Sequence, residues 1–120
     1  MAHLSSEEIA QFRSKLSQYP NCLIALDAIE DCEGDLEDAA IVLAIRSGQD
    51  PDIANSQWLD GLARQCRASI CREEFSADLQ NGLPGGAIAD LATTGICPPL
   101  LATPVVIYVI KQGIHEFCNL

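Results

Sequence analysis

The sequence predicts an all-α fold: a single compact bundle of about five to seven helices with a buried, apolar C-terminal helix. Apolar residues recur at helical spacing along most of the chain, and capping and stop residues separate these runs. Only one segment is rich in β-branched residues, so a strand there would have no partner. The 120 residues are 48% hydrophobic and 20% charged, which suits a single domain over 1–120.

The first part of the chain is expected to hold three helices. A capping-box pattern over Ser5–Glu8 starts the first helix, which stops near Pro20. Asn21 is expected to cap the second helix and Asp35 the third, because both side chains accept hydrogen bonds from free N–H groups at a helix start. Gly48 then closes the third helix.

Three shorter helices are expected next. Ser56 is expected to cap a helix in which Trp58 is a core anchor. A further helix ends near Asn81, and a turn rich in glycine and proline follows over 83–86. Residues 87–93 predict a short helix after that turn.

The last segment could be a helix or a strand. Val105–Ile110 is β-branched or aromatic throughout and could form a buried strand. We favour a helix, because Thr103-Pro104 reads as a cap followed by proline at the first helical position, and the run could extend to Phe117. A helix that is apolar all round would lie at the centre of the bundle. A transmembrane helix is not expected, because the apolar stretch 96–110 is shorter than a bilayer span and contains three prolines.

Negative charge is concentrated in the first half of the chain. Residues 1–60 hold twelve acidic and three basic residues, whereas residues 61–120 hold five and four. Such a field repels phosphate backbones and anionic headgroups, so we expect no nucleic-acid partner and no membrane partner. A protein partner with a basic surface is favoured instead. The expected contact surface is the acidic junction of the second and third helices: Asp27, Glu30, Asp31, Glu33, Asp35, Glu37 and Asp38.

The sequence contains no complete pattern for a metal site or a catalytic centre. Alternating carboxylates from Asp31 to Asp35 match the start of a calcium loop, but Leu36 and Val42 stand where that loop needs a glycine and a bidentate acid. His115 and Cys118 would need two distant thiols to complete a zinc site. We therefore expect no catalytic residues, no metal and no cofactor.

Six cysteines are present, and we expect them to be reduced. The chain shows no export signal and is larger than the disulfide-rich miniproteins, so a cytoplasmic location is predicted. Cys71 is the candidate reactive thiol, since Arg67 lies one helical turn before it and Arg72 adjoins it. Positive charge at these positions favours the thiolate.

A glycine-acid turn, Glu33-Gly34-Asp35, precedes a helix that supplies Ala39 and a pair of large aliphatic residues. In this respect the segment 23–48 resembles the second and third helices of ubiquitin-associated-like domains. With the first helix, residues 5–48 could complete a three-helix unit similar to the one at the start of elongation factor Ts. The loop that usually presents methionine, glycine and an aromatic residue to ubiquitin is here Tyr19-Pro20-Asn21, so ubiquitin itself is not the expected partner.

The domain is expected to have two parts: an acidic three-helix subunit over 5–48 and a near-neutral half, 49–120, packed against it. The expected function is a helical protein–protein interaction or adaptor module with an acidic contact surface. Two alternatives stay open: a protein that binds a small molecule or cofactor with the apolar segment 100–110 as a pocket wall, and a thiol-based redox protein at Cys71. A homodimer is also considered, since a two-fold contact could hide part of the apolar C-terminal helix.

Overall fold

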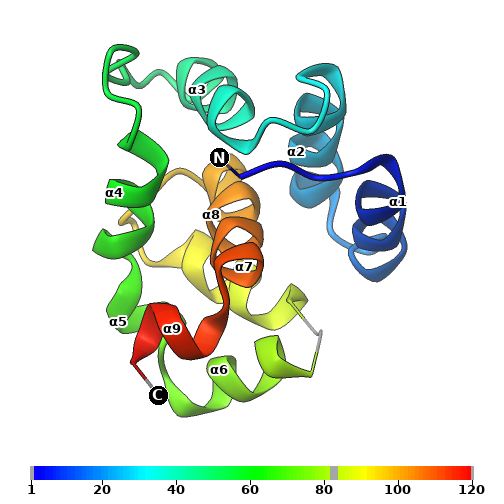
Figure 1. Ribbon diagram of the computed structural model, residues 1–120, viewed down its shortest axis with the longest axis vertical. Helices are drawn as coiled ribbons and strands as arrows, with labels where there is room; N and C mark the ends of the chain where they lie inside the picture. The colour runs from blue at the N-terminus through cyan, green and yellow to red at the C-terminus, as the bar shows by residue number, and fades with distance from the viewer. Residues whose placement is uncertain (1, 82–83, 120) are drawn as a thin grey trace.

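The computed structural model describes residues 2–81 and 84–119 and shows an all-α fold, which confirms the predicted class (Figure 1). Nine helices lie in these ranges, above the expected range of about five to seven, because two of the expected helices are each broken in two. The helices are α1 Ser6–Lys15, α2 Pro20–Asp31, α3 Leu36–Arg46, α4 Trp58–Gln65, α5 Arg67–Ile70, α6 Glu73–Gln80, α7 Gly85–Thr93, α8 Pro99–Gln112 and α9 Ile114–Cys118.

Two of the predicted helix starts are confirmed by side-chain caps. The Ser5 hydroxyl accepts a hydrogen bond from the Glu8 amide at 3.1 Å, and the Glu8 carboxylate accepts one from the Ser5 amide at 3.0 Å. At the start of α3 the Asp35 carboxylate accepts a hydrogen bond from the Asp38 amide at 3.1 Å. These caps supply partners for N–H groups that a helix start leaves free.

Two other predicted caps are wrong. α2 begins at Pro20 and not after Asn21, because proline needs no N–H partner at the first helical position and its φ is already helical. α4 begins at Trp58 without a side-chain cap from Ser56. There the side chain and carbonyl of Asn55 accept hydrogen bonds that fold the chain into a turn before the helix.

The predicted turn over 83–86 is also wrong in the part that the structure describes. Gly85 and Gly86 form the start of α7, while Leu83 lies outside the described residues. A Cβ atom at Gly85 would come within 2.8 Å of the Tyr19 side chain, so a larger residue at the start of α7 would displace the Tyr19 ring. The predicted end of the preceding helix near Asn81 is confirmed.

The last apolar segment is a helix and not a strand, but it begins earlier than predicted. α8 starts at Pro99, and Pro104 lies inside it. Pro98 is the N-cap and Pro99 the first helical residue, where the fixed φ of proline suits the start of a helix. Pro104 is buried, so its ring packs in the core at the cost of one backbone hydrogen bond. Gly113 ends α8. The predicted extension of this helix to Phe117 is instead a separate helix, α9.

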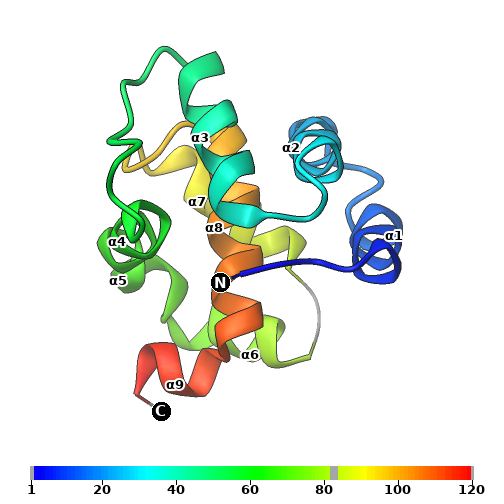
Figure 2. The same ribbon diagram turned by 45° about the horizontal axis from the view of Figure 1, so that its top comes forward.

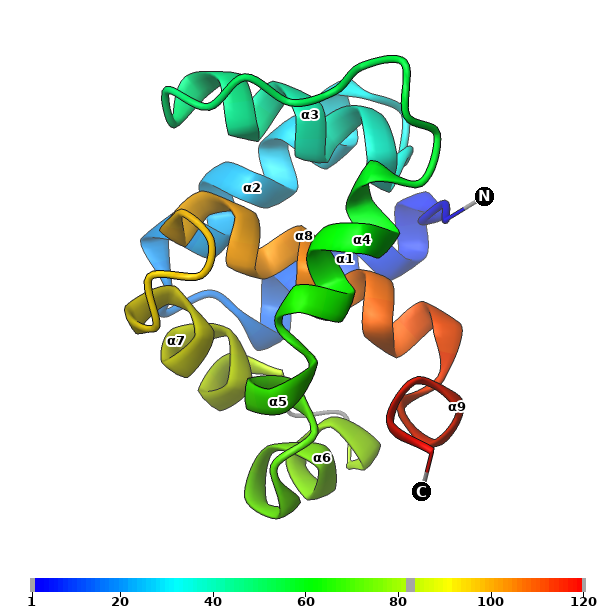
Figure 3. The same ribbon diagram turned by 90° about the vertical axis from the view of Figure 1, so that its left-hand side faces the viewer.

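α8 occupies the centre of the molecule, as Figures 2 and 3 show. It packs against α2, α3, α4, α7 and α9, and Leu101, Val105 and Ile107 are each 0% exposed. The predicted buried C-terminal helix is therefore confirmed. Because neighbouring helices of the same chain cover α8, hiding it does not require a second copy. In the part of the chain that the structure describes, no helix combines the length and apolar character needed to cross a bilayer.

The start of the chain is held against the turn between α2 and α3. The Leu4 amide donates a hydrogen bond to the Gly34 carbonyl at 2.9 Å, and the Leu36 amide donates one to the Ala2 carbonyl at 3.1 Å. Gly34 has a φ of +88°, and a Cβ atom there would collide with the Leu4 carbonyl oxygen. Only glycine fits this position. The arrangement places Ala2 beside Glu37 at the start of α3.

Substitution of Ile107 by alanine tests the central position of α8. The Ile107→Ala variant should lose about 2–5 kcal/mol of unfolding free energy, because it leaves a cavity among fully buried side chains. Ile45→Ala is the matched control, since Ile45 also lies in a helix but is 55% exposed, and it should change stability by less than about 0.5 kcal/mol. Urea denaturation measures both. Equal losses for the two variants would contradict the central position of α8.

Candidate functional site

The seven acidic residues predicted as one contact surface lie in three different settings. Asp27 and Glu30 on α2 both pair with Arg13 on α1, at 2.8 Å and 3.0 Å from its guanidinium. The charge of both acids is thus partly neutralised by a residue of the neighbouring helix. Asp31 and Glu33 are exposed where α2 ends. These four residues therefore do not share a site with the other three.

The remaining three acids, Asp35, Glu37 and Asp38, line a cavity of about 590 Å³. It lies where the start of α3 meets the segment before α4, α4 itself and α8. Its volume is within the range of about 300–1,000 Å³ that is usual for ligand pockets. The other lining residues are Ile41, Ile53, Asn55, Ser56, Gln57, Trp58, Leu59, Asp60, Arg64 and Tyr108.

Asp60 organises the wall of the cavity formed by α4 and α8. The Tyr108 hydroxyl donates a hydrogen bond to one Asp60 oxygen at 2.7 Å, and the Arg64 guanidinium donates one to the other oxygen at 2.7 Å. The bonds from Tyr108 and Arg64 lower the pKa of Asp60. Burial, with the hydrogen bond to Asp60, raises the pKa of Tyr108 to about 12. Both oxygens of Asp60 are therefore occupied, and the charge of Arg64 is compensated.

Glu37 forms part of the opposite wall. One of its oxygens accepts a hydrogen bond from the Ala2 amide at 3.3 Å. The other oxygen is buried and has no hydrogen-bond partner among the described residues. Glu37 and Tyr108 also line a second hollow, of about 320 Å³, together with Lys111. These two side chains thus stand between the larger cavity and the smaller one.

Uncompensated negative charge lies on the α3 side of the cavity. In the described part of the chain, Asp35, Glu37 and Asp38 form no ion pair, whereas Asp60 pairs with Arg64. The N-terminal end of the α3 dipole offsets part of this charge but cannot balance three carboxylates. Aromatic and aliphatic residues, among them Trp58, line the same space. The arrangement suits a cation that also has an apolar part.

Of the thirteen described residues that line this site, only Asp35, Glu37 and Asp38 were predicted as site residues. Trp58, predicted as a core anchor, is half-buried: it packs against the core and also lines the cavity. The pair Asp60–Arg64 could have been recognised, since the two residues are four apart on one helix face. No local pattern indicates the bond between Tyr108 and Asp60, which are 48 positions apart.

The apolar segment 100–110 does not form the pocket wall expected under the small-molecule alternative. Most of it is packed inside the core, and among the cavity-lining residues only Tyr108 belongs to it.

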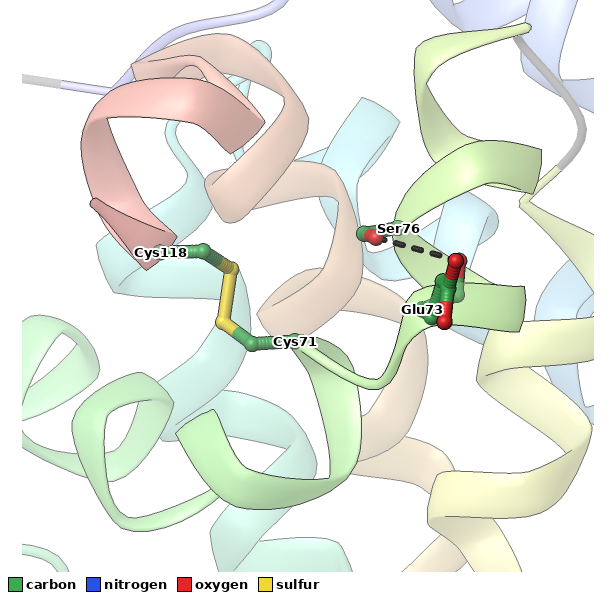
Figure 4. Close-up of a disulfide and its surroundings, with 4 residues drawn as sticks. All are labelled: Cys71, Glu73, Ser76 and Cys118. Atoms are coloured by element: carbon green, nitrogen blue, oxygen red, sulfur yellow. Dashed lines mark hydrogen bonds between the residues drawn. A yellow bond between two sulfur atoms is a disulfide. The ribbon is translucent and has the colours of Figure 1, made fainter. Parts of the chain in front are cut away.

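Cys71 is not a reactive thiol in this structure, because it forms a disulfide with Cys118 (Figure 4). The prediction that all six cysteines are reduced is therefore wrong for this pair. The fold brings the end of α5 next to the end of α9, and the Cα atoms of the two cysteines are 5.6 Å apart. The cysteines are separated by 47 positions, so their spacing in the sequence gave no signal. Disulfides persist mainly in oxidising compartments. This pair therefore does not support the predicted cytoplasmic location, which stays a prediction.

The other four cysteines, Cys22, Cys32, Cys66 and Cys97, are free. Cys66 and Cys97 are buried and lie near each other. The neighbouring Cys66 thiol and burial raise the pKa of Cys97, so its thiol stays protonated at neutral pH. Cys118 cannot serve as a zinc thiolate beside His115 while it is bonded to Cys71. Among the residues whose placement is described, no three potential metal ligands come together.

The disulfide should contribute to stability. A Cys71→Ser/Cys118→Ser variant should lose about 2–4 kcal/mol of unfolding free energy, since the bond closes a long loop in the unfolded chain. Cys32→Ser is the control, because Cys32 is a free, half-buried cysteine and its loss should cost much less. Thermal unfolding with and without reductant provides the measurement. If reductant left the melting temperature of the native chain unchanged, the bond would be absent or without effect.

The Tyr108–Asp60 hydrogen bond can be tested by ultraviolet titration of tyrosinate. A Tyr19→Phe background leaves Tyr108 as the single tyrosine. Its midpoint should lie at about 12, and Asp60→Asn should lower it, because the acceptor charge is lost while burial remains. The stabilising effect of this bond is present below the ordinary tyrosine pKa of about 10 and is lost as the pH rises through the folded value. An unchanged midpoint in Asp60→Asn would exclude the bond.

Comparisons with protein-family models, with curated proteins and with solved structures find no match to this chain. The resemblance of residues 5–48 to ubiquitin-associated-like units therefore stays a prediction. The geometry and charge of the cavity between α3, α4 and α8 are the basis on which a function can be assigned.

Proposed function

We propose that this protein is a helical protein-interaction module that binds a basic surface of a partner protein. The observation that carries this proposal is the cavity of about 590 Å³, which combines uncompensated carboxylates on α3 with the apolar residues of α4 and of the segment before it. The contact surface is thus narrower than the seven acidic residues predicted from the sequence. It consists of Asp35, Glu37 and Asp38 together with the α4 side of the cavity.

Electrostatics supports a basic partner. The whole chain carries a formal charge of −10, and most of it belongs to the first half. A field of this sign attracts positively charged proteins during diffusional encounter and disfavours acidic ones. At the cavity itself, the one guanidinium of the lining is held by Asp60 and does not neutralise the acids on α3.

The apolar part of the cavity supports a protein partner in particular. Ile53 is 70% exposed at its edge, and the half-buried Trp58 lies five positions further along the chain. Protein interfaces typically combine a small apolar and aromatic centre with a polar rim. The resemblance of residues 5–48 to ubiquitin-associated-like units, a class of protein-binding domains, favours the same proposal.

Reversal of one charge at the cavity tests the proposal. Asp38→Lys should weaken capture of partner proteins about tenfold, because it places a cation against a basic surface. Asp31→Lys is the matched control, since it changes the net charge equally at an exposed acid away from the cavity. Both variants and the native chain are used as bait in extract from the source cells, and captured proteins are quantified by mass spectrometry. Capture of the same proteins in the same amounts by both variants would contradict the proposal.

A further inference from the structure

The carboxylate oxygens that line the cavity differ in whether they already accept a hydrogen bond within the chain. Both oxygens of Asp60 are occupied by Tyr108 and Arg64. One oxygen of Asp35 caps the Asp38 amide at 3.1 Å, and its second oxygen has no partner in the described residues. Asp38 is exposed, and its carboxylate likewise forms no hydrogen bond within the described ranges. Free acceptors are therefore offered by Asp35, the N-cap of α3, and by Asp38 in the first turn of the helix.

Glu37 adds negative charge behind these two acids. Its unpartnered oxygen is buried, so a ligand in the cavity does not touch it. Its charge nevertheless acts on the cavity, because interactions with a partly buried carboxylate are screened less than those at an open surface. A cation in front of Asp35 and Asp38 would thus experience three negative charges.

The remaining wall is suited to the stem of a long side chain. Ile41 and Ile53 provide aliphatic surface, and Trp58 provides an aromatic ring in the same cavity. Arginine and lysine both bury an aliphatic stem on such surfaces. Arginine is favoured here, because its guanidinium is weakly hydrated, associates well with aromatic rings and carries several donors that can reach two carboxylates at once.

We infer that the cavity between α3 and α4 receives an arginine side chain of the partner protein, which Asp35 and Asp38 bind by charge-assisted hydrogen bonds and Trp58 contacts through its ring. This inference rests on the proposed function and names the group that the surface recognises. The Arg64 side chain of this chain does not take that place, because Asp60 holds it at 2.7 Å on the preceding helical turn.

Fluorescence offers a direct test, since Trp58 is the single tryptophan of the chain. The probe is the tripeptide leucine-arginine-leucine, acetylated and amidated, with a second peptide in which citrulline replaces arginine. Citrulline keeps the shape of the side chain and removes its charge. The arginine peptide should change Trp58 fluorescence saturably below about 5 mM, and the citrulline peptide should bind at least about tenfold more weakly. Equal binding of the two peptides, or no saturable change with the arginine peptide, would overturn the inference.

Matched variants locate the binding. Asp38→Asn should weaken the arginine peptide about threefold to tenfold, whereas Asp31→Asn should leave its affinity unchanged. In ¹H–¹⁵N spectra of the native chain, shifts should concentrate at Asp35, Asp38 and the Trp58 indole. Shifts confined to residues outside the cavity would overturn the inference.

Butylguanidinium, a guanidinium compound with a single positive charge and no peptide backbone, distinguishes a protein partner from a small molecule. It should bind more weakly than the tripeptide, because it provides the guanidinium and its aliphatic stem but lacks the leucine side chains and the backbone that extend the contact. Equal affinity would overturn the assignment to a protein side chain.

If the peptides fail to bind while Asp38→Lys still loses its partners, the inferred arginine is wrong but the proposed function stands. If Asp38→Lys also behaves like Asp31→Lys, the proposed function fails as well.

Discussion

The burial of α8 is the constraint on which the rest of the structure depends. From Leu101 to Ile107 every residue of this helix is buried, so it cannot lie at the surface of so small a chain. The other helices cover it: α2 and α3 from the first part of the chain, α4 and α7 from the second. Burial of this area from water drives the two parts together and accounts for one continuous core.

The candidate site is a consequence of this arrangement. Near its end α8 carries two polar residues that reach outward: Tyr108 binds Asp60 on α4, and Lys111 pairs with Glu8 at the start of α1 at 2.9 Å. By holding α4 beside α3, α8 sets the width of the cavity that Tyr108 lines. The carboxylates of α3 serve their own helix as well, since Asp35 caps it. The cap of α3 thus lies next to a cavity in which the one lining arginine, Arg64, is paired with Asp60.

Features determined by neighbours in the sequence could be predicted, and features determined by distant contacts could not. The caps at Ser5 and Asp35 follow from residues three positions apart. By contrast, the Tyr19 side chain packs against Gly85 from 66 positions away in the chain. The disulfide and the Tyr108–Asp60 bond likewise join residues without any local pattern. The acidic surface was therefore predicted as one patch, and only the tertiary fold divides it into an ion-paired part, an exposed part and a cavity wall.

A fragment of residues 1–48 tests most directly whether α8 organises the fold. In the complete chain α2 and α3 bury their apolar faces against α8, including Leu26 and Leu43, which are each 0% exposed. Without α8 these faces would be open to water, and so short a chain has little other core. Circular dichroism and amide chemical-shift dispersion should therefore show a largely unfolded fragment. A helical fragment that unfolds cooperatively on heating would contradict this account and show that the first three helices form a domain of their own.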